Sequence, residues 1–256
     1  MWKIENEGFV RTLTLDRLEA MNALSPAIIT ELIEILEQTG QDDSVRVLIM
    51  TGKDKIFSSG MDVKALANPS DPEIAHMFNY SVPKMFNAFI DFPKPLIMAV
   101  NGMGVGWGAT VLGHADLVIM AENAKLKCPF SSLAVVPEAC STEIFPRFMG
   151  HQKAFWLLLS GEWFNAEQCL DAGLAFEVVP DEDLLSIAMQ RAQTLAAAPR
   201  VALVSGKALL KAPHRDASRR ANREEMDRFI EILEHPACKE GISAFFEKRR
   251  ADYSRF

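Results

Sequence analysis

The sequence predicts an α/β protein with a helical C-terminal portion. Apolar strand patterns alternate with helical patterns through the first half of the chain, which implies a mixed or parallel sheet covered by helices. From about residue 143 the strand patterns give way to successive helical ones. The chain has 256 residues, 49% of them apolar, which is enough for one large hydrophobic core.

The first half of the chain contains both the two-residue alternation of strands and the amphipathic spacing of helices. Residues 9–16 alternate between polar and apolar side chains, as a half-buried strand does. Residues 25–42 form an amphipathic helical pattern, with Ser25 placed as its N-cap and Pro26 in its first turn. Further strands are predicted over 44–53, 95–102 and 115–123, and helices over 61–67 and 73–90.

The helical portion has clear end signals. Asn165 is placed to cap one helix, and Gly161 and Gly173 are placed to end two others. We expect helices over 142–162, 165–174, 183–198 and 200–212, and within 223–250. We divide the chain into an α/β core, residues 1–195, and a helical C-terminal region, residues 196–256, which together form one functional domain.

Composition and charge exclude several classes of function. The net charge of −7 opposes general nucleic-acid binding, and no apolar run is long enough to span a membrane. The four cysteines lack metal-ligand spacing, so we expect no metal site and a reducing compartment. The chain enters a strand pattern without a targeting signal, and its end, YSRF, is not of the peroxisomal Ser-Lys-Leu type, so we expect a cytoplasmic protein.

Two glycine-marked turns leave backbone N–H groups free to donate. In FSSGMD, residues 57–62, a strand ends, Gly60 permits an unusual backbone, and Asp62 is better placed as a helix cap than as a base. In NGMGVGWGATVLG, residues 101–113, a glycine-rich turn follows an apolar strand. That turn leaves the first amides of the next helix unpaired, at the positive end of the helix dipole.

The second turn also loosely matches the dinucleotide-binding fingerprint. Gly104, Gly106 and Ala109 fit its pattern, and Glu122 ends the following strand. Only about eight residues separate the glycines from Asp116, which is too few for the crossover helix of a nucleotide-binding unit. Tight packing of a strand against a helix is therefore the better explanation, and NAD-dependent chemistry is the weaker alternative.

Glu138 is a lone carboxylate in the apolar stretch LAVVPEACST, residues 133–142. Its side chain is either solvated after Pro137 or buried with a raised proton affinity. Cys140 could be a nucleophile, but no histidine is near it in sequence, so a buried apolar cysteine is the better interpretation. Glu143 is the nearest competing acid and is placed to open the next helix.

Together these motifs resemble the enoyl-CoA hydratase/isomerase family, also called the crotonase superfamily, over nearly the whole chain. The resemblance rests on NAL at 22–24, FSSGMD at 57–62, KPLIMAVNGMGVGWG at 94–108, ADLVIMAENAKL at 115–126 and LSGEWFNAEQCLDAGLAFEVVP at 159–180. It implies a crotonase-like spiral of ββα units with a helical C-terminal region used in trimer assembly. It also implies an acyl-CoA thioester as the ligand, no cofactor beyond the coenzyme A of that substrate, and a homotrimer or a dimer of trimers.

The resemblance further implies an oxyanion hole of two backbone N–H groups, which map to Met61 and Trp107. Such donors act where negative charge grows on the thioester oxygen, and losing one typically costs about 3–4 kcal/mol of barrier. The substrate and its CoA moiety are expected at Ala23, Ser59, Gly60, Asp62 and Gly106. The Lys248-Arg249-Arg250 cluster either binds CoA phosphates or is ordinary surface charge.

The positions of the acids predict the subtype. Hydratases of the family resemble one another in using two glutamates, and the matching positions here hold Thr110 and Phe130. The run PFSSLAVVPEACST resembles the peroxisomal-type Δ3,Δ2-enoyl-CoA isomerases, in which the acid at the Glu138 position is the base. An isomerase needs one carboxylate that takes a proton from C2 and returns it at C4, and burial suits that task by raising the pKa of the acid.

Two other functions stay open. An acid at the Glu138 position also resembles the nucleophile of 4-chlorobenzoyl-CoA dehalogenases, although the tryptophan that precedes the acid in that subgroup is missing here. The chain could instead be an acyl-CoA-binding module without turnover, since related domains occur in chromatin proteins. Affinity for CoA without turnover of any thioester would indicate such a module.

Overall fold

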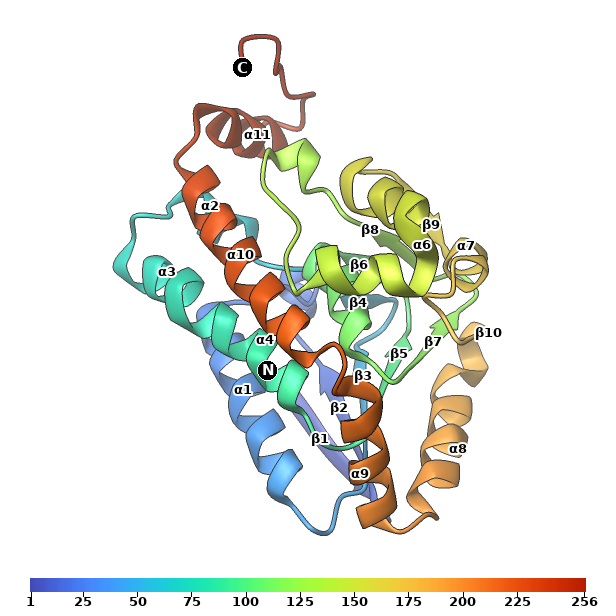
Figure 1. The fold of residues 1–256 in the computed structure, drawn as a ribbon. Coiled ribbons are helices and arrows are strands. Elements are labelled where there is room, and N and C mark those ends of the chain that lie inside the picture. Colours follow the sequence, from blue (N-terminus) through green and yellow to red (C-terminus); the bar gives the residue numbers. More distant parts are fainter.

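The computed structural model describes all 256 residues, and its strands form two sheets (Figure 1). The six-stranded sheet has the order β1 (Trp2–Glu7), β2 (Val10–Leu15), β3 (Val47–Gly52), β5 (Leu96–Val100), β7 (Leu117–Ala121) and β10 (Glu177–Val179). The four-stranded sheet has the order β4 (Ile56–Ser58), β6 (Met103–Val105), β8 (Lys125–Lys127) and β9 (Trp163–Asn165). Neighbouring strands are parallel except for the β1–β2 and β8–β9 pairs.

Three successive strand pairs build both sheets. In β3–β4, β5–β6 and β7–β8, the first strand joins the six-stranded sheet, the second joins the four-stranded sheet, and a helical segment follows. This is a spiral of ββα units, and it confirms the predicted mixed, largely parallel sheet. The strand predicted to end in FSSGMD is β4, whereas β6, β8 and β9 of the four-stranded sheet escaped prediction because each is three residues long, too short for a period of two to show.

Helices pack around the sheets. α1 (Pro26–Gln41) packs against α4 (Val82–Asp91), and α10 (Arg215–Leu233) lies across α4 and contacts α6 (Ser141–Leu159) (Figure 1). α8 (Leu184–Ala196) packs against β3, β5 and β7. The remaining helices are α2 (Val63–Ala67), α3 (Pro72–His76), α5 (Trp107–Thr110), α7 (Ala166–Asp171), α9 (Arg200–Lys211) and α11 (Pro236–Phe246).

The predicted helix ends are confirmed. Ser25 Oγ accepts the Ile28 N–H at 3.5 Å at the start of α1, and Asn165 forms a capping box at the start of α7. Gly161 and Gly173 follow α6 and α7 with φ values of 70° and 79°, the left-handed backbone that suits glycine after a helix.

Three predicted helices are interrupted. The 73–90 segment is α3 and α4 joined by a π-helical turn, because Pro83 has no N–H with which to continue the regular ladder. α6 bends at Gly150, whose φ is 73°. The last helical stretch is two helices, α10 and α11, and the second is capped by His235 Nδ1, which accepts the Ala237 N–H at 3.1 Å.

The core lies between the sheets and the helices, and it includes the four cysteines, all of them buried and free of disulfides. No helix combines the length and the apolar character needed to cross a lipid bilayer. The division of the chain at residue 195 stays a prediction; α8 ends one residue later, at Ala196.

Candidate active site

Glu138 lies between β8 and α6, and its side chain is buried rather than solvated, since the residue is 3% exposed. Its Oε1 atom accepts a hydrogen bond from the Thr110 hydroxyl at 2.6 Å, whereas Oε2 is buried without any partner. Buried polar atoms are nearly always hydrogen-bonded, and an unpaired carboxylate oxygen is typical of a group that acts on a ligand.

Burial raises the pKa of Glu138 to about 8, from an ordinary value of 4.5. The hydrogen bond from Thr110 opposes this rise, and the negative charge of Glu225 adds to it. A carboxyl group whose pKa is near neutrality can both accept and return a proton at physiological pH, as general acid–base catalysis requires.

The first glycine-marked turn follows β4. Gly60 has a φ of 85°, and a Cβ atom there would lie 2.5 Å from the Val105 carbonyl oxygen, so the turn requires glycine. Leu24 bonds on both sides of the turn, donating to the Gly60 carbonyl at 2.8 Å and accepting from the Asp62 N–H at 3.0 Å. Between these two bonds, the N–H of Met61 donates to no group of the chain.

The second turn lies between β6 and α5. Gly106 has φ 55° and ψ −119°, and α5 begins directly after it. The N–H of Trp107 is therefore the first of the helix, and it has no acceptor in the chain. The two turns touch, because a Cβ atom on Gly60 would lie 3.3 Å from the Trp107 nitrogen. The two free N–H groups thus belong to adjacent backbone segments.

Thr110 links the carboxylate to the second turn. Its hydroxyl lies 2.6 Å from Glu138 Oε1, 3.2 Å from the Gly106 carbonyl oxygen and 3.5 Å from the Trp107 carbonyl oxygen. Glu138 is thereby tied to the helix whose first N–H is free. A carbonyl group that is polarised by two N–H donors and flanked by a carboxylate can lose a proton from its adjacent carbon.

The residues expected at the CoA moiety lie mainly on two segments that run side by side, 20–24 and 58–62. Ala23, Ser59, Gly60 and Asp62 lie in these segments, and Gly106 lies just before α5. The Ser59 N–H donates to the Met21 carbonyl at 3.1 Å. Asp62 accepts the N–H two residues further on, at 3.1 Å, so the interpretation of Asp62 as a helix cap is confirmed.

Cys140 and Glu143, the two reactive side chains nearest to Glu138 in the sequence, have structural roles. Burial raises the pKa of the Cys140 thiol well above its ordinary range, so the thiol stays protonated and is a poor nucleophile. Glu143 lies in the first turn of α6 and pairs with Arg147 at 3.0 Å, as expected of an acid that opens a helix.

Two residues of the site were missed by sequence reasoning. In the sequence, Thr110 stands out only because it occupies a position where hydratases have a glutamate, and its hydroxyl contact with Glu138 is visible only in the fold. Glu225 on α10 is 6% exposed and lies close to the segment that carries Glu138. Its signal in the sequence is its position on the buried stripe of α10, between Asn222 and Phe229, where an acid is unexpected.

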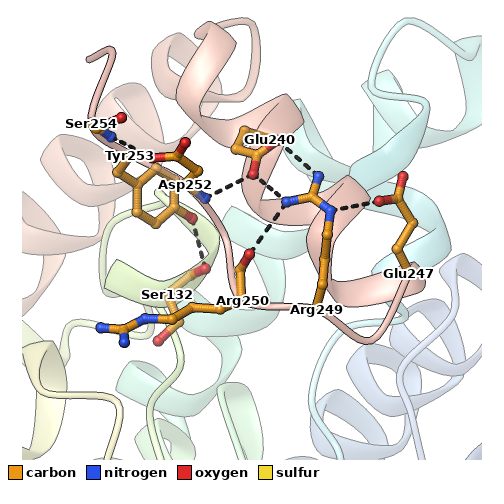
Figure 2. Close-up of polar contacts among 8 residues, drawn as sticks. All are labelled: Ser132, Glu240, Glu247, Arg249, Arg250, Asp252, Tyr253 and Ser254. Carbon is orange, nitrogen blue, oxygen red and sulfur yellow. Dashed lines mark hydrogen bonds and ion pairs between the residues drawn. The ribbon is translucent and has the colours of Figure 1, made fainter.

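The C-terminal basic cluster is partly engaged within the chain (Figure 2). Arg249 pairs with Glu240 through two nitrogens and with Glu247 through a third. Arg250 points away from that pair in Figure 2, and neither Lys248 nor Arg250 forms an ion pair. The same segment holds the loop before Glu138, since the Tyr253 hydroxyl donates to the Ser132 carbonyl at 2.7 Å.

Comparison with known proteins identifies the family. The profile of the family described as Enoyl-CoA hydratase/isomerase matches residues 5–255. The chain belongs to the enoyl-CoA hydratase/isomerase (crotonase) family. It is therefore an acyl-CoA enzyme of a family that typically needs no cofactor. Pseudomonas aeruginosa OdaA has the same fold, with a TM-score of 0.89 and 38% identity over 95% of this chain and 98% of that one.

Relatives in this family differ in their named activities. Two Escherichia coli proteins are similar over nearly their whole length. The 2,3-dehydroadipyl-CoA hydratase is 33% identical over 98% of this chain and 97% of that protein. The 1,2-epoxyphenylacetyl-CoA isomerase is 34% identical over 97% of this chain and 96% of that protein. Enoyl-CoA delta isomerase 2 of Rattus norvegicus is 33% identical over 96% of this chain, which spans 63% of the rat protein.

Proposed function

We propose that this family member is an enoyl-CoA isomerase that moves a double bond from position 3 to position 2 of an acyl-CoA. The observation that carries the proposal is one buried carboxylate, Glu138, bonded to the helix that begins with the free Trp107 N–H. A raised pKa and an unpaired oxygen suit this carboxylate to take up a proton and give it back.

The reaction follows from these groups. The thioester carbonyl accepts hydrogen bonds from the N–H groups of Met61 and Trp107. Glu138 takes a proton from C2 on its unpaired Oε2, the electron pair moves toward the thioester oxygen, and a dienolate forms. Glu138 then returns the proton to C4 as the double bond forms between C2 and C3. The two donors act on the charge that grows on the oxygen, where preorganised N–H groups lower the barrier most.

Thr110 keeps the carboxyl group oriented through this cycle. While Glu138 is ionised, the Thr110 hydroxyl donates to Oε1, at 2.6 Å. Once Glu138 carries the proton on Oε2, Oε1 is the carbonyl oxygen of the acid and still accepts the Thr110 hydrogen bond. Oε1 stays fixed in either state, which leaves Oε2 to face the substrate.

Hydration is disfavoured by the residues at the two hydratase positions. Thr110 does not ionise in the range where water would need activation, and Phe130 is an apolar side chain that is 5% exposed. Adding water across a double bond needs one group to activate the water and usually a second to carry its proton. With one carboxylate in reach, the site supports proton transfer within the substrate instead.

We also propose that the protein assembles as a trimer or a dimer of trimers. Support comes from large apolar side chains that are exposed on α6, on α7 and just after α7, where a monomer would leave them in water. These side chains are Phe148, Phe155, Trp156, Leu170 and Phe176. Light scattering would test this, since a mass near that of one 28.5 kDa chain would contradict it.

The experiment that tests the isomerase replaces Glu138. E138Q keeps the size of the side chain but cannot take up a proton, so we expect conversion of 3-hexenoyl-CoA to fall by about 10²–10⁴-fold. E122Q is the matched control, because Glu122 is an exposed acid directly after β7. Activity of E138Q close to that of the wild type would remove Glu138 from the mechanism.

A wider set of substrates distinguishes the isomerase from the acyl-CoA-binding module and the dehalogenase. A panel of enoyl, hydroxyacyl and aryl thioesters would be offered to the wild-type protein. Binding of CoA without turnover of any of them would favour the acyl-CoA-binding module. Mass spectrometry that detects an aryl group attached to Glu138 would favour chemistry of the dehalogenase type.

A further inference from the structure

α10 presents one buried carboxylate to the segment that carries Glu138. Glu225 accepts three hydrogen bonds, from the Cys140 N–H at 2.7 Å, from the Thr142 N–H at 2.9 Å and from the Thr142 hydroxyl at 2.5 Å. It is 6% exposed, whereas the side chain of its neighbour Glu224 is 72% exposed. A buried carboxylate that receives three donors from one short segment is a fixed anchor for that segment.

The anchored segment has an unusual backbone. Ala139 and Cys140 have φ values of 61° and 59°, two consecutive left-handed residues that are not glycine. Residues with a Cβ atom rarely adopt this conformation, and they keep it only where the surrounding structure enforces it. Cys140 makes no side-chain cap for α6, so Glu225 supplies the cap from another helix. The sharp turn that aims Glu138 thus depends on Glu225.

Charge couples the two acids as well. Burial raises the pKa of Glu225 to about 7, against the effect of its three hydrogen bonds, and Glu143 adds to the rise. Once ionised, Glu225 raises the pKa of Glu138. The other titratable groups near this pair are the buried thiols of Cys128 and Cys140, which burial keeps neutral, and His114, whose pKa burial lowers to about 3.

We propose that Glu225 is a positioning residue for Glu138: its carboxylate fixes the 139–142 turn that carries Glu138, and its negative charge acts on the Glu138 carboxyl group. This inference rests on the proposed role of Glu138 as the base of the isomerase. Glu225 itself touches no reacting atom. Its effect reaches the substrate through the direction of the Glu138 side chain and through the proton affinity of that side chain.

The test compares E225Q with E224Q. In E225Q the amide NH2 group faces the Cys140 N–H, so that bond is lost together with the charge. We expect kcat to fall about 10- to 100-fold, with KM within about twofold of wild type. The acidic limb of the pH profile of kcat should move to lower pH, because the charge that raises the pKa of Glu138 is gone. E224Q, on the exposed face of α10, should match the wild type in both respects.

A purely structural cap would give a different result. If E225Q lowered kcat without moving the acidic limb, or matched E224Q in both, the proposal would be overturned. Should E225Q not fold, T142V removes one of the three donors and leaves the carboxylate in place. We expect T142V to lower kcat about two- to fivefold, and T142S, which keeps the hydroxyl, to recover it. Equal activity of T142V and the wild type would count against the anchor.

A titration without substrate separates this inference from the proposed function. The carboxyl band of Glu138 would be followed by infrared spectroscopy against pH and assigned by its loss in E138Q. A lower midpoint in E225Q than in the wild type supports the coupling even if the wild type isomerises nothing, in which case only the proposed function fails. An unchanged midpoint overturns the coupling whatever the activity.

Discussion

The two halves of the candidate site are built by different means. The donors at Met61 and Trp107 are backbone N–H groups of two turns whose shape is set by the glycine before each of them. Glu138 is a side chain on a segment that is held from a distance. Thr110 lies 28 residues before it, and Glu225 lies 85 residues beyond Cys140.

This difference determines which changes each half tolerates. A backbone donor survives any substitution that preserves the path of the chain, so glycines are critical there and side chains are not. A buried carboxylate depends instead on the groups that set its direction and its proton affinity. Substitution of a glycine in either turn should therefore cause a large, abrupt loss of kcat. Removal of one contact to Glu138 should cause a smaller loss of kcat and a shift in its pH dependence.

Among changes that leave the Glu138 side chain in place, the largest effect is expected for G60A, which alters one of the two turns directly. The new Cβ atom would lie 2.5 Å from the Val105 carbonyl oxygen, in a residue whose φ is 85°. We expect loss of at least about 10²–10³-fold in kcat, the effect of removing one oxyanion donor. The free energy of unfolding should fall by about 1–3 kcal/mol, measured by urea denaturation.

Gly206 is the matched control for that change. It lies in α9, and a Cβ atom there meets nothing within 4 Å. G206A should leave activity unchanged and raise the free energy of unfolding by about 0.5–1 kcal/mol, because alanine is the better helix former. A G60A protein with full activity would show that the Met61 donor does not depend on this turn.

A smaller effect is expected for T110V, which acts on the side-chain half. Valine has the shape of threonine but cannot donate to Glu138, and the Thr110 hydrogen bond lowers the pKa of that carboxyl. The pKa should therefore rise above about 8, so that less of the base is ionised at neutral pH. We expect kcat at pH 7 to fall about tenfold or more, since a hydrogen bond to a charged group contributes roughly 1.5–3 kcal/mol.

The direction of the pH shift makes T110V diagnostic. Its acidic limb should move to higher pH, opposite to the shift expected for E225Q, because Thr110 favours the ionised carboxylate and Glu225 disfavours it. At a pH well above the new limb, T110V should regain much of the lost rate. T110S keeps the hydroxyl and should leave the limb in place. A limb that does not move in T110V would mean that Glu138 is not the titrating base.

The sequence predicts the first half of the site better than the second for the same reason. A glycine required by a turn is visible in the sequence as Gly60 or Gly106, and the residue that follows it supplies the backbone N–H group. The burial of Glu138 could be suspected from its apolar neighbours, but its contacts with Thr110 and Glu225 come from other parts of the fold. Three-residue strands such as β8 are not visible in the sequence for a related reason, because their pairing is a long-range property.

The smallest effect is expected for M61A, although residue 61 directly follows Gly60. Alanine keeps the backbone N–H and the adjoining hydrogen bonds that Leu24 makes to Gly60 and Asp62, so the proposed donor stays where it is. The lost side chain is partly buried at the edge of the core, which predicts a loss of stability of about 1 kcal/mol and a kcat within about threefold of wild type. Steady-state kinetics on 3-hexenoyl-CoA would measure kcat, and urea denaturation would measure the stability. If M61A lost as much rate as G60A, the side chain and not the peptide N–H would be the functional group at this position.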